Sequence, residues 1–371
     1  MKGDIRHLFG DRSLPKTIKM DRNKALSALE HFEIEHTQYE LYPINQGFIN
    51  DTFRVSSRGT NLFVLQRLNT SVFPKALTLM NNLGKLLPIL QGNAYHSLQL
   101  FQTESGENFH IDTHGDYWRL LSYIPDSKTF NTTRDKAIAF ETGRILGEFH
   151  TLLQGIPLTH FEDTLPNFHN LEKRLEEFEV ALKNASRERL KKAAKIILTV
   201  QENLIRSTID PTIEVPLRIC HNDTKLNNIL FSKTTGKALC LIDLDTVMQG
   251  YFHYDFGDAV RTVVNTAPED EPNLDIISFD LELFEAMVQG IKKSGLVLSS
   301  VEKTLLAYGP VLMPFLHGLR ALTDYLNNDI YYKVAFPEQN LKRSNSLVAF
   351  SQKAFEKKAA MVQIIEKILG A

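Results

Sequence analysis

The stretch His221-Asn222-Asp223-Thr224-Lys225-Leu226-Asn227-Asn228 is followed, one short hairpin later, by Leu241-Ile242-Asp243-Leu244-Asp245. Asp223 precedes the amide of Asn228 by five residues, and Asp243 follows the next apolar run. A carboxylate can orient an attacking oxygen, while an Asn and a second Asp can hold the Mg²⁺ that neutralises nucleotide phosphates. These two stretches therefore predict transfer of a phosphoryl group from a nucleotide to an alcohol.

Local geometry supports this prediction. Three short apolar runs, 217–220, 229–231 and 238–242, are typical of strands, and Thr234-Thr235-Gly236 marks a turn between the last two. The loop from His221 to Asn228 would then lie at one end of a hairpin, and Asp243 would emerge at that same end. Oxygen ligands of this kind suit Mg²⁺, which keeps several waters and takes one or two protein carboxylates.

The string H-x-D-x-x-x-x-N followed by two apolar residues and Asp resembles the catalytic and metal loops of the aminoglycoside phosphotransferase and choline kinase superfamily. Longer strings are similar to one branch of it, the N-acetylhexosamine 1-kinases, and the similarity runs from about Tyr39 to about Lys333. The strings are Gly47–Phe53, Phe63–Asn69, His221–Asn228, Ile242–Met248 and Asp255–Thr262.

The resemblance implies an α+β, two-lobed protein-kinase-like fold with a small β-rich N-lobe and a larger helical C-lobe. It implies an enzyme that uses ATP and Mg²⁺ to phosphorylate the anomeric hydroxyl of GlcNAc or GalNAc by direct in-line transfer. Asp223 would be the catalytic carboxylate, and Asn228 and Asp243 would hold the metal. Lys225 could stabilise charge on the transferring phosphoryl group, although a solvated loop lysine is the alternative.

Hydrophobic patterns fit a β-rich N-terminal nucleotide-binding lobe with its hinge over residues 1–124, and a helical C-terminal lobe with catalytic loop and substrate site over 125–371. Expected strands cover 39–44, 52–56, 62–68, 98–101, 108–111 and 117–124. Expected helices cover 74–87, 135–153, 171–182, 188–205, 279–293, 301–327 and 341–369, with a further helix opened by Asp255.

The nucleotide end carries weaker signals. We predict a phosphate-covering turn around Gly47 and Asn50, with Thr52 on the next strand, although an ordinary hairpin turn predicts the same residues. Protein kinases place a Lys on the third strand and pair it with a helix Glu. This chain has Arg67 on the third strand and two asparagines, Asn81 and Asn82, where the Glu is expected. Arg67 either contacts phosphate or is a solvated strand residue.

The run 118–125 is expected to cross between the lobes. Its backbone would bind adenine at Leu121 and Tyr123, although a plain sheet strand ending at Pro125 fits the same sequence.

The resemblance implies two polar groups on the substrate side. Asp258 and Arg261 would bind sugar hydroxyls and an acetamido carbonyl, and Arg320, Asp324 and Tyr332 would form a second group. Both pairs of opposite charge are also spaced as ordinary helix ion pairs. Asp255 would anchor the catalytic loop, and the segment 265–275 is either a lid or a surface loop.

Composition argues against several classes of partner and location. With 42 Lys+Arg against 44 Asp+Glu, the chain shows no charge pattern for nucleic acid or an anionic membrane. Cys220 and Cys240 lie in apolar runs and are expected to be buried thiols. No signal-like or membrane-spanning run is apparent, so a cytoplasmic location is expected.

Three functional alternatives remain. Choline, an aminoglycoside or homoserine could be the acceptor, and a quaternary ammonium would call for aromatic residues around it. Asp243-Leu244-Asp245 also fits the nucleophile motif of haloacid-dehalogenase-like phosphatases, in which Asp243 would attack phosphate. A kinase-like binding protein without catalysis is the third alternative.

Overall fold

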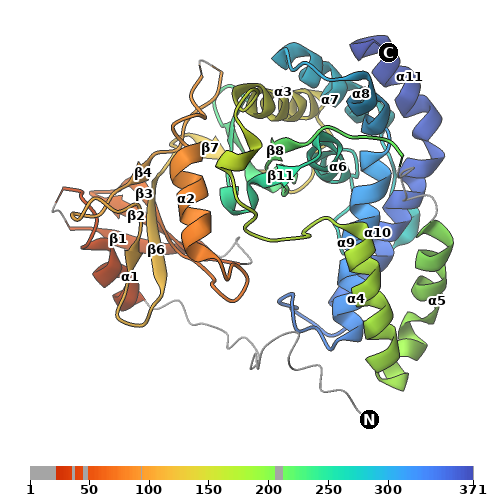
Figure 1. Cartoon of the computed structure of the whole chain (residues 1–371), viewed down its shortest axis with the longest axis horizontal. Coiled ribbons are helices and arrows are strands. Elements are labelled where there is room, and N and C mark those ends of the chain that lie inside the picture. Colours follow the sequence, from red (N-terminus) through yellow and green to blue (C-terminus); the bar gives the residue numbers. More distant parts are fainter. Residues whose placement is uncertain (1–21, 36–37, 45–48, 93, 205–211, 371) are drawn as a thin grey trace.

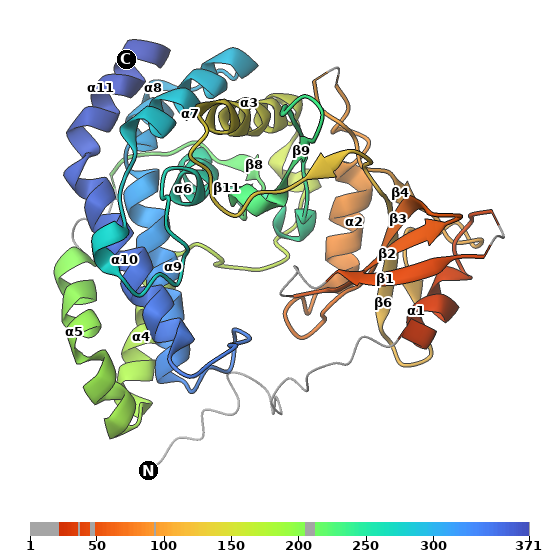
Figure 2. The same cartoon turned by 180° about the vertical axis from the view of Figure 1, so that it is seen from behind.

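The computed structural model describes residues 22–35, 38–44, 49–92, 94–204 and 212–370. A sheet-bearing lobe lies on the left in Figure 1 and a larger helical lobe on the right. Figure 2 shows the same division from behind. The expected two-lobed α+β fold is therefore confirmed.

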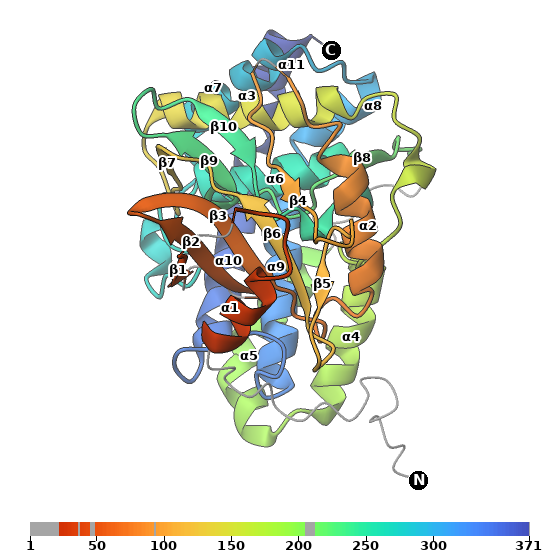
Figure 3. The same ribbon diagram turned by 90° about the vertical axis from the view of Figure 1, so that its left-hand side faces the viewer.

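The N-terminal sheet is antiparallel, with strand order β1-β2-β3-β6-β4, and β5 also pairs with β6. Its apolar face packs on helix α1 through Phe53, Leu65 and Trp118, which share a core with Ala25 and Leu29. Figure 3 shows α1 in front of this sheet and α2 beside it. The elements are α1 (Arg22–Leu29), β1 (Glu40–Ile44), β2 (Asp51–Ser57), β3 (Thr60–Arg67), α2 (Ala76–Leu86), β4 (Leu100–Phe101), β5 (His110–Ile111) and β6 (Tyr117–Ser122).

The C-terminal lobe surrounds two small sheets with helices. Strands β10, β9 and β7 form one sheet, and β11 pairs with β8 in the other. The strands are β7 (Ser127–Lys128), β8 (Arg218–Cys220), β9 (Ile229–Ser232), β10 (Ala238–Leu241) and β11 (Met248–Gly250). The helices are α3 (Lys136–Leu152), α4 (Leu171–Asn184), α5 (Arg187–Asn203), α6 (Phe252–Val263), α7 (Leu281–Ser294), α8 (Ser300–Leu306), α9 (Gly309–Leu326), α10 (Gln339–Glu356) and α11 (Lys358–Leu369).

Helices α3 and α7 cross with almost no space between their backbones. A Cβ on Gly143 would lie 1.9 Å from the carbonyl oxygen of Met287, and a Cβ on Gly290 would lie 2.0 Å from that of Phe140. Because only glycine fits at these two positions, the crossing fixes α3 against the core. Helix α3 carries His150, whose Nε2 lies 2.9 Å from Oδ2 of Asp255 in α6.

The predicted boundary at residue 124 stays a prediction, and one element complicates it. Helix α2 belongs to the N-terminal half of the chain, yet Leu83 and Leu86 share a core with Val247 and other residues of the helical lobe. Its Asn82 side chain donates to the carbonyl oxygen of Glu162 at 2.8 Å. Helix α2 is therefore held by both parts of the molecule.

Two expected helices were wrong in extent. The expected helix over 301–327 is broken at 307–308 into α8 and α9, and Pro310, which has no N–H to donate, lies in the first turn of α9. The expected helix over 341–369 is broken at Lys357, where neither Gly nor Pro marks the break. In the described part of the chain, no single helix meets the length and hydropathy required to span a membrane; α8 and α9 meet it only together, across a 58° bend.

Candidate active site

The catalytic loop is anchored to helix α6 by one buried carboxylate. Asp255 Oδ2 accepts hydrogen bonds from the backbone N–H of His221 at 2.8 Å and from His150 Nε2 at 2.9 Å. Its Oδ1 accepts from the backbone N–H of Asn222 at 2.7 Å, and its backbone oxygen accepts from Thr224 Oγ1 at 2.5 Å. Asp255 has no exposed surface, so it fixes the loop in the way expected for it.

His221 has a structural position. Its Nε2 donates to the carbonyl oxygen of Ile242 at 2.9 Å, and its Nδ1 accepts from the backbone N–H of Asp223 at 3.2 Å. Both ring nitrogens are thus used to tie the loop to the end of the hairpin, and neither is left for proton transfer.

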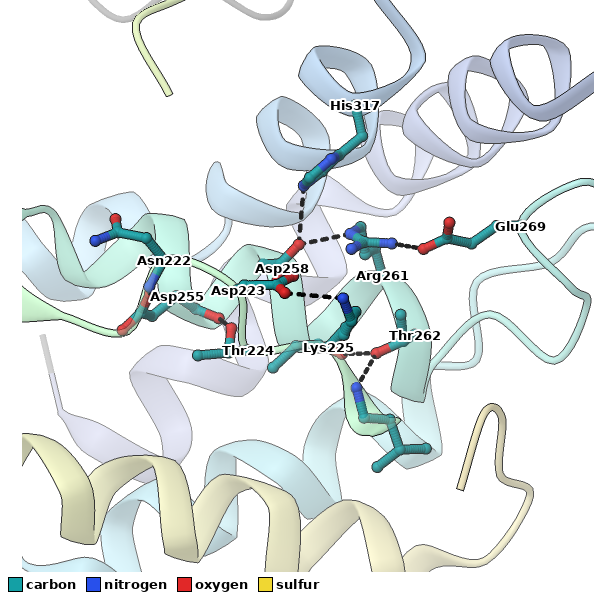
Figure 4. A network of polar contacts seen from close by, with 12 residues as sticks. Asn222, Asp223, Thr224, Lys225, Asp255, Asp258, Arg261, Thr262, Glu269 and His317 are labelled. Carbon is teal, nitrogen blue, oxygen red and sulfur yellow. Dashed lines mark hydrogen bonds and ion pairs between the residues drawn. The ribbon is translucent and has the colours of Figure 1, made fainter. Parts of the chain in front are cut away.

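Asp223, Lys225 and Asn228 meet within hydrogen-bonding distance. Lys225 Nζ lies 2.8 Å from Asp223 Oδ2, and Asn228 Nδ2 donates to the same oxygen at 2.9 Å. Burial alone would raise the pKa of Asp223, but the charge of Lys225 brings it below its ordinary value. Figure 4 shows the lysine pointing at this carboxylate. Because Oδ2 is occupied, Oδ1 is the oxygen left to contact an acceptor.

Asp243 comes to the same end of the hairpin. The backbone N–H of Ile242 donates to the carbonyl oxygen of Asn228 at 2.8 Å, which places the two predicted metal ligands side by side. Asp243 has φ 62° and ψ 52°, a left-handed conformation that non-glycine residues rarely adopt and that clusters at functional sites. The chain therefore turns sharply at this carboxylate.

The electrostatics at Asp243 fit a cation. Burial and then the neighbouring Asp245 raise the pKa of Asp243 to about 6. Among the described residues no Lys, Arg or His forms an ion pair with it within 4.0 Å. The amide nitrogen of Asn228 is used by Asp223, which leaves the amide oxygen as a ligand. An unpaired carboxylate beside an amide oxygen matches the ligand preference of a hard divalent cation.

The predicted nucleotide residues differ in what they contact. Gly47 lies outside the described residues. Asn50 Nδ2 donates to Asp245 Oδ2 at 2.6 Å, so this asparagine reaches the turn that follows Asp243 (residues 243–246, here called the metal loop). Thr52 Oγ1 accepts from Gln66 Nε2 at 3.1 Å on the neighbouring strand. Only Asn50 of the two is seen to contact the helical lobe, and binding of nucleotide at either residue stays a prediction.

Arg67, predicted as a possible phosphate ligand, is paired with carboxylates of its own lobe. Its guanidinium is held by two carboxylates, Asp51 at 3.0 Å from Nε and Asp116 at 3.0 Å from Nη1. Side chains alternate along a strand, so Arg67 and its neighbour Gln66 point to opposite faces of β3. A guanidinium already paired twice is poorly placed to bind phosphate, and nothing observed supports that role.

Strand β6, which is expected to cross between the lobes, is paired with a strand on each side. Leu121 is opposite Val64 of β3 on one side and Leu100 of β4 on the other. The backbone N–H of Tyr123 donates to the carbonyl oxygen of Leu62 at 2.9 Å, so this donor is used within the protein. Binding of adenine at Leu121 and Tyr123 stays a prediction.

One charged residue of the site was missed. Arg119 on β6 lies with Nη1 2.5 Å from Asp245 Oδ1, and its Nε donates to Gln66 Oε1 at 2.9 Å. The signal was present in the sequence, because an arginine inside the apolar strand Trp118-Arg119-Leu120-Leu121 must find a carboxylate if it is buried. What the sequence lacked was the identity of that partner.

On the acceptor side, Asp258 and Arg261 form the helix ion pair that was the alternative to substrate binding. Arg261 Nε donates to Asp258 Oδ1 at 2.6 Å, and His317 Nε2 lies 3.0 Å from the same oxygen. Arg261 also contacts Glu269, whose other oxygen accepts from Arg343 at 2.7 Å. The segment 265–275 is thereby tied to helices α6 and α10. Figure 4 shows Arg261 between Asp258 and Glu269, with Asp223 close to Asp258.

Asp258 keeps one oxygen without a partner. Its Oδ2 is buried and accepts no hydrogen bond from the described residues. Burial would raise the pKa of Asp258, but Arg261 and His317 bring it well below its ordinary value, so this group carries a charge. Burial and then Arg261 lower the pKa of His317 to about 3, which makes the imidazole a neutral donor.

The second predicted substrate group, Arg320, Asp324 and Tyr332, is not held together as one cluster. Asp324 accepts from the backbone N–H of Tyr331 at 2.8 Å and of Tyr332 at 2.9 Å, and from Asn340 Nδ2 at 2.9 Å. Both carboxylate oxygens thus hold the segment that follows α9, and no contact supports a substrate role. Tyr332 itself stacks under the guanidinium of Arg343, 4.9 Å from its ring centre.

Arg320 is the exception on this side. It does not pair with Asp324, and none of the described carboxylates lies within ion-pair distance of it. Its guanidinium lies 4.7 Å from the ring centre of Phe168 and 5.7 Å from that of Tyr331. Burial opposes its charge, while Tyr332, Tyr331 and Asp223 raise the pKa of Arg320. Arg320 is thus a cation stacked on aromatic rings, and its role in substrate binding stays a prediction.

Comparison with known proteins gives the class of this molecule. The model of the phosphotransferase enzyme family matches residues 40–287. The chain belongs to this family of kinase-like phosphotransferases that act on small molecules, so it is an enzyme. Membership makes the haloacid-dehalogenase-like phosphatase alternative wrong.

Solved structures of low identity share the fold. A microcompartment-associated aminopropanol kinase is 16% identical, with a TM-score of 0.62 over 92% of this chain and 98% of that chain. An aminoglycoside phosphotransferase from Alicyclobacillus acidocaldarius is 14% identical, with a TM-score of 0.60 over 97% and 99%. An amicoumacin kinase in complex with AMP-PNP and Ca²⁺ is 13% identical, with a TM-score of 0.55 over 91% and 94%.

Proposed function

We propose that this enzyme transfers the terminal phosphoryl group of ATP to the anomeric hydroxyl of an N-acetylhexosamine, GlcNAc or GalNAc. The observation that carries the proposal is the meeting of Asp223, Lys225, Asn228 and Asp243 at one end of the catalytic hairpin. A direct, in-line transfer without a covalent enzyme intermediate needs only a positioned acceptor, a compensating charge and a metal site.

Each residue of the loop has a defined task. The free Oδ1 of Asp223 accepts a hydrogen bond from the sugar hydroxyl and orients its oxygen, while Lys225 and Asn228 hold the carboxylate from its other oxygen. Lys225 also lies where its charge can stabilise oxygens of the transferring group. Asn228 and Asp243 would hold Mg²⁺, which neutralises the phosphate charge when it is bound.

Charge on the acceptor side favours an uncharged substrate. Choline and aminoglycosides are cations, and a site for them requires unpaired carboxylates or open aromatic faces. The charge of Asp258 is compensated by Arg261, with a hydrogen bond from the neutral His317, whereas Arg320 has no carboxylate partner among the described residues and already covers Phe168. A guanidinium donates well to an acetamido carbonyl and to hydroxyls, which an N-acetylhexosamine supplies.

The test is ATP consumption with Mg²⁺ against GlcNAc, GalNAc, glucose, choline, homoserine and kanamycin, with the product identified by phosphorus NMR. A sugar 1-phosphate signal with an N-acetylhexosamine supports the proposal. Turnover only with choline, homoserine or kanamycin would overturn the acceptor assignment and keep the catalytic residues.

Two variants separate the roles. Asp223→Asn should lower kcat by about 10²–10⁴-fold while ATP still binds, since general-base or orienting contacts contribute on this scale. Arg320→Met should raise KM for the sugar and leave KM for ATP unchanged, because the ring contacts of Arg320, with Phe168 and Tyr331, lie within the helical lobe. A sugar KM unaffected by Arg320→Met would remove this residue from the acceptor site.

A further inference from the structure

Asp245, two residues after Asp243, is one of the places at which the two lobes meet. Its Oδ1 pairs with Arg119 Nη1 at 2.5 Å, and its Oδ2 accepts from Asn50 Nδ2 at 2.6 Å. Its backbone oxygen accepts from Thr164 Oγ1 at 3.0 Å. Both carboxylate oxygens are therefore taken by residues of the sheet-bearing lobe, while the backbone is held by the helical lobe.

Arg119 is held in place by a row of side chains across the sheet. Gln66 of β3 is directly opposite Arg119 of β6, accepts from its Nε at 2.9 Å and donates to Thr52 of β2 at 3.1 Å. The side chains of Arg119 and Asp245 are 2% and 1% exposed. This buried ion pair joins the two lobes, and removal of either partner would leave the other as an uncompensated buried charge.

The pair is connected to Asp243 through the backbone. Asp245 lies in the short 3-10 turn Leu244–Thr246, whose first residue follows Asp243 directly. Asp243 takes its left-handed conformation at the start of this turn. The position of the Asp243 carboxylate therefore depends on how this turn is held.

We propose that Arg119 and Asp245 form an interlobe ion pair that positions the metal ligand Asp243 when the lobes close. Arg119 and Asp245 are positioning residues, and the proposal rests on the proposed role of Asp243 in holding the metal. It gives this chain a closure device made from a cation on β6, where protein kinases use a Lys on the third strand and a helix Glu. Here the third strand offers Gln66, and Asn82 of α2 instead donates to backbone oxygens of the helical lobe.

The chain contains a matched control for this pair. Arg67 is also an arginine of the same sheet, is 11% exposed and is paired with Asp51 and Asp116, but both partners belong to the sheet-bearing lobe. Arg119→Met and Arg67→Met each remove a guanidinium from this lobe, and only the first removes a contact with the metal loop.

The experiment is calorimetric binding of Mg²⁺-ATP to the full chain without an acceptor, with far-UV circular dichroism as a check on folding. Arg119→Met should weaken binding by about 10–100-fold, the usual loss when a residue that orients a metal ligand is removed. Arg67→Met should bind like the wild type. The same loss in both variants, or wild-type binding by folded Arg119→Met, would overturn the proposal.

Two further variants cover the remaining outcomes. The double variant with Arg119→Met and Asp245→Asn should bind Mg²⁺-ATP no worse than Arg119→Met alone, because both substitutions remove the same ion pair. Additive losses would show two independent effects and contradict the proposal. If Arg119→Met does not fold, Gln66→Leu removes the hydrogen bond that orients Arg119, together with the one that Gln66 donates to Thr52. This variant should weaken Mg²⁺-ATP binding in the same direction, and unchanged binding would count against the proposal. Since no acceptor is present, failure of the sugar assignment cannot be mistaken for failure of this inference.

Discussion

Asp255→Ala tests how the catalytic loop is held, and the expected loss can be worked from the contacts. The substitution removes the acceptor of three buried donors: the backbone N–H groups of His221 and Asn222 and the Nε2–H of His150. A buried donor left without a partner costs about 1–3 kcal/mol. Relief of the desolvation of a buried carboxylate offsets part of this, so we expect a loss of about 3–5 kcal/mol in the free energy of unfolding.

A second aspartate provides the control. Asp280 also accepts hydrogen bonds from two backbone N–H groups, those of Glu282 and Leu283, but it does so at the half-exposed start of α7. Water can replace it there, so Asp280→Ala should cost about 1 kcal/mol, the usual value for an N-cap. The two variants thus differ mainly in burial.

The measurement is urea unfolding of both variants followed by far-UV circular dichroism. Fluorescence is unsuitable alone because the single Trp, Trp118, lies in the sheet-bearing lobe. Domains have stabilities of about 5–15 kcal/mol, so the loss is measurable in a folded protein. Equal losses for Asp255→Ala and Asp280→Ala would refute the reasoning that burial of these donors decides the cost.

Three more expectations follow from other parts of the molecule. Asp243→Ala should abolish Mg²⁺-dependent ATP binding in calorimetry, and unchanged binding would remove Asp243 from the metal site. Gly143→Ala places a Cβ 1.9 Å from the Met287 oxygen and should cost about 1–3 kcal/mol or more by thermal unfolding, whereas Gly92→Ala, whose Cβ would make only ordinary contacts from 3.4 Å, should be nearly neutral. Burial lowers the pKa of His253 to about 4, so between pH 6.5 and 4 the unfolded chain binds a proton that the native protein does not, and stability falls as pH falls. This histidine should lower the free energy of unfolding by about 2 kcal/mol from pH 7 to pH 5. In urea unfolding, the free energy of unfolding of His253→Gln should therefore depend less steeply on pH, and the same pH dependence in variant and wild type would contradict the assignment.

The catalytic end was predictable from sequence because its geometry is local. The turn at Gly236 and the apolar runs on either side specify a hairpin, and a hairpin by itself brings Asn228 and Asp243 together. No knowledge of the rest of the chain is needed for that step. The resemblance then supplied the two-lobed fold and the family.

The charged residues elsewhere were harder because their partners are distant in the chain. Whether Arg67 or Arg119 reaches the metal loop depends on the face of β3 and β6 on which each lies, and on the packing of β6 against a loop more than a hundred residues away. The spacing of Arg320 and Asp324 allowed a helix ion pair, but the backbone of the following segment takes both oxygens of Asp324. Spacing limits which groups can meet, and tertiary contacts decide which do.

The position of the buried cation has a consequence for classifying related chains. Gln66 of the third strand and Arg119 of β6 are cross-strand neighbours, so the buried positive charge lies one strand further across the sheet than the third-strand lysine of protein kinases. A survey that recognises active enzymes by a third-strand lysine would count this chain among the inactive ones. A criterion based on position in space, which asks for any cation in contact with the acidic loop after the metal ligand, would keep it. Chains set aside for lacking that lysine can be re-sorted by this criterion from their structures alone.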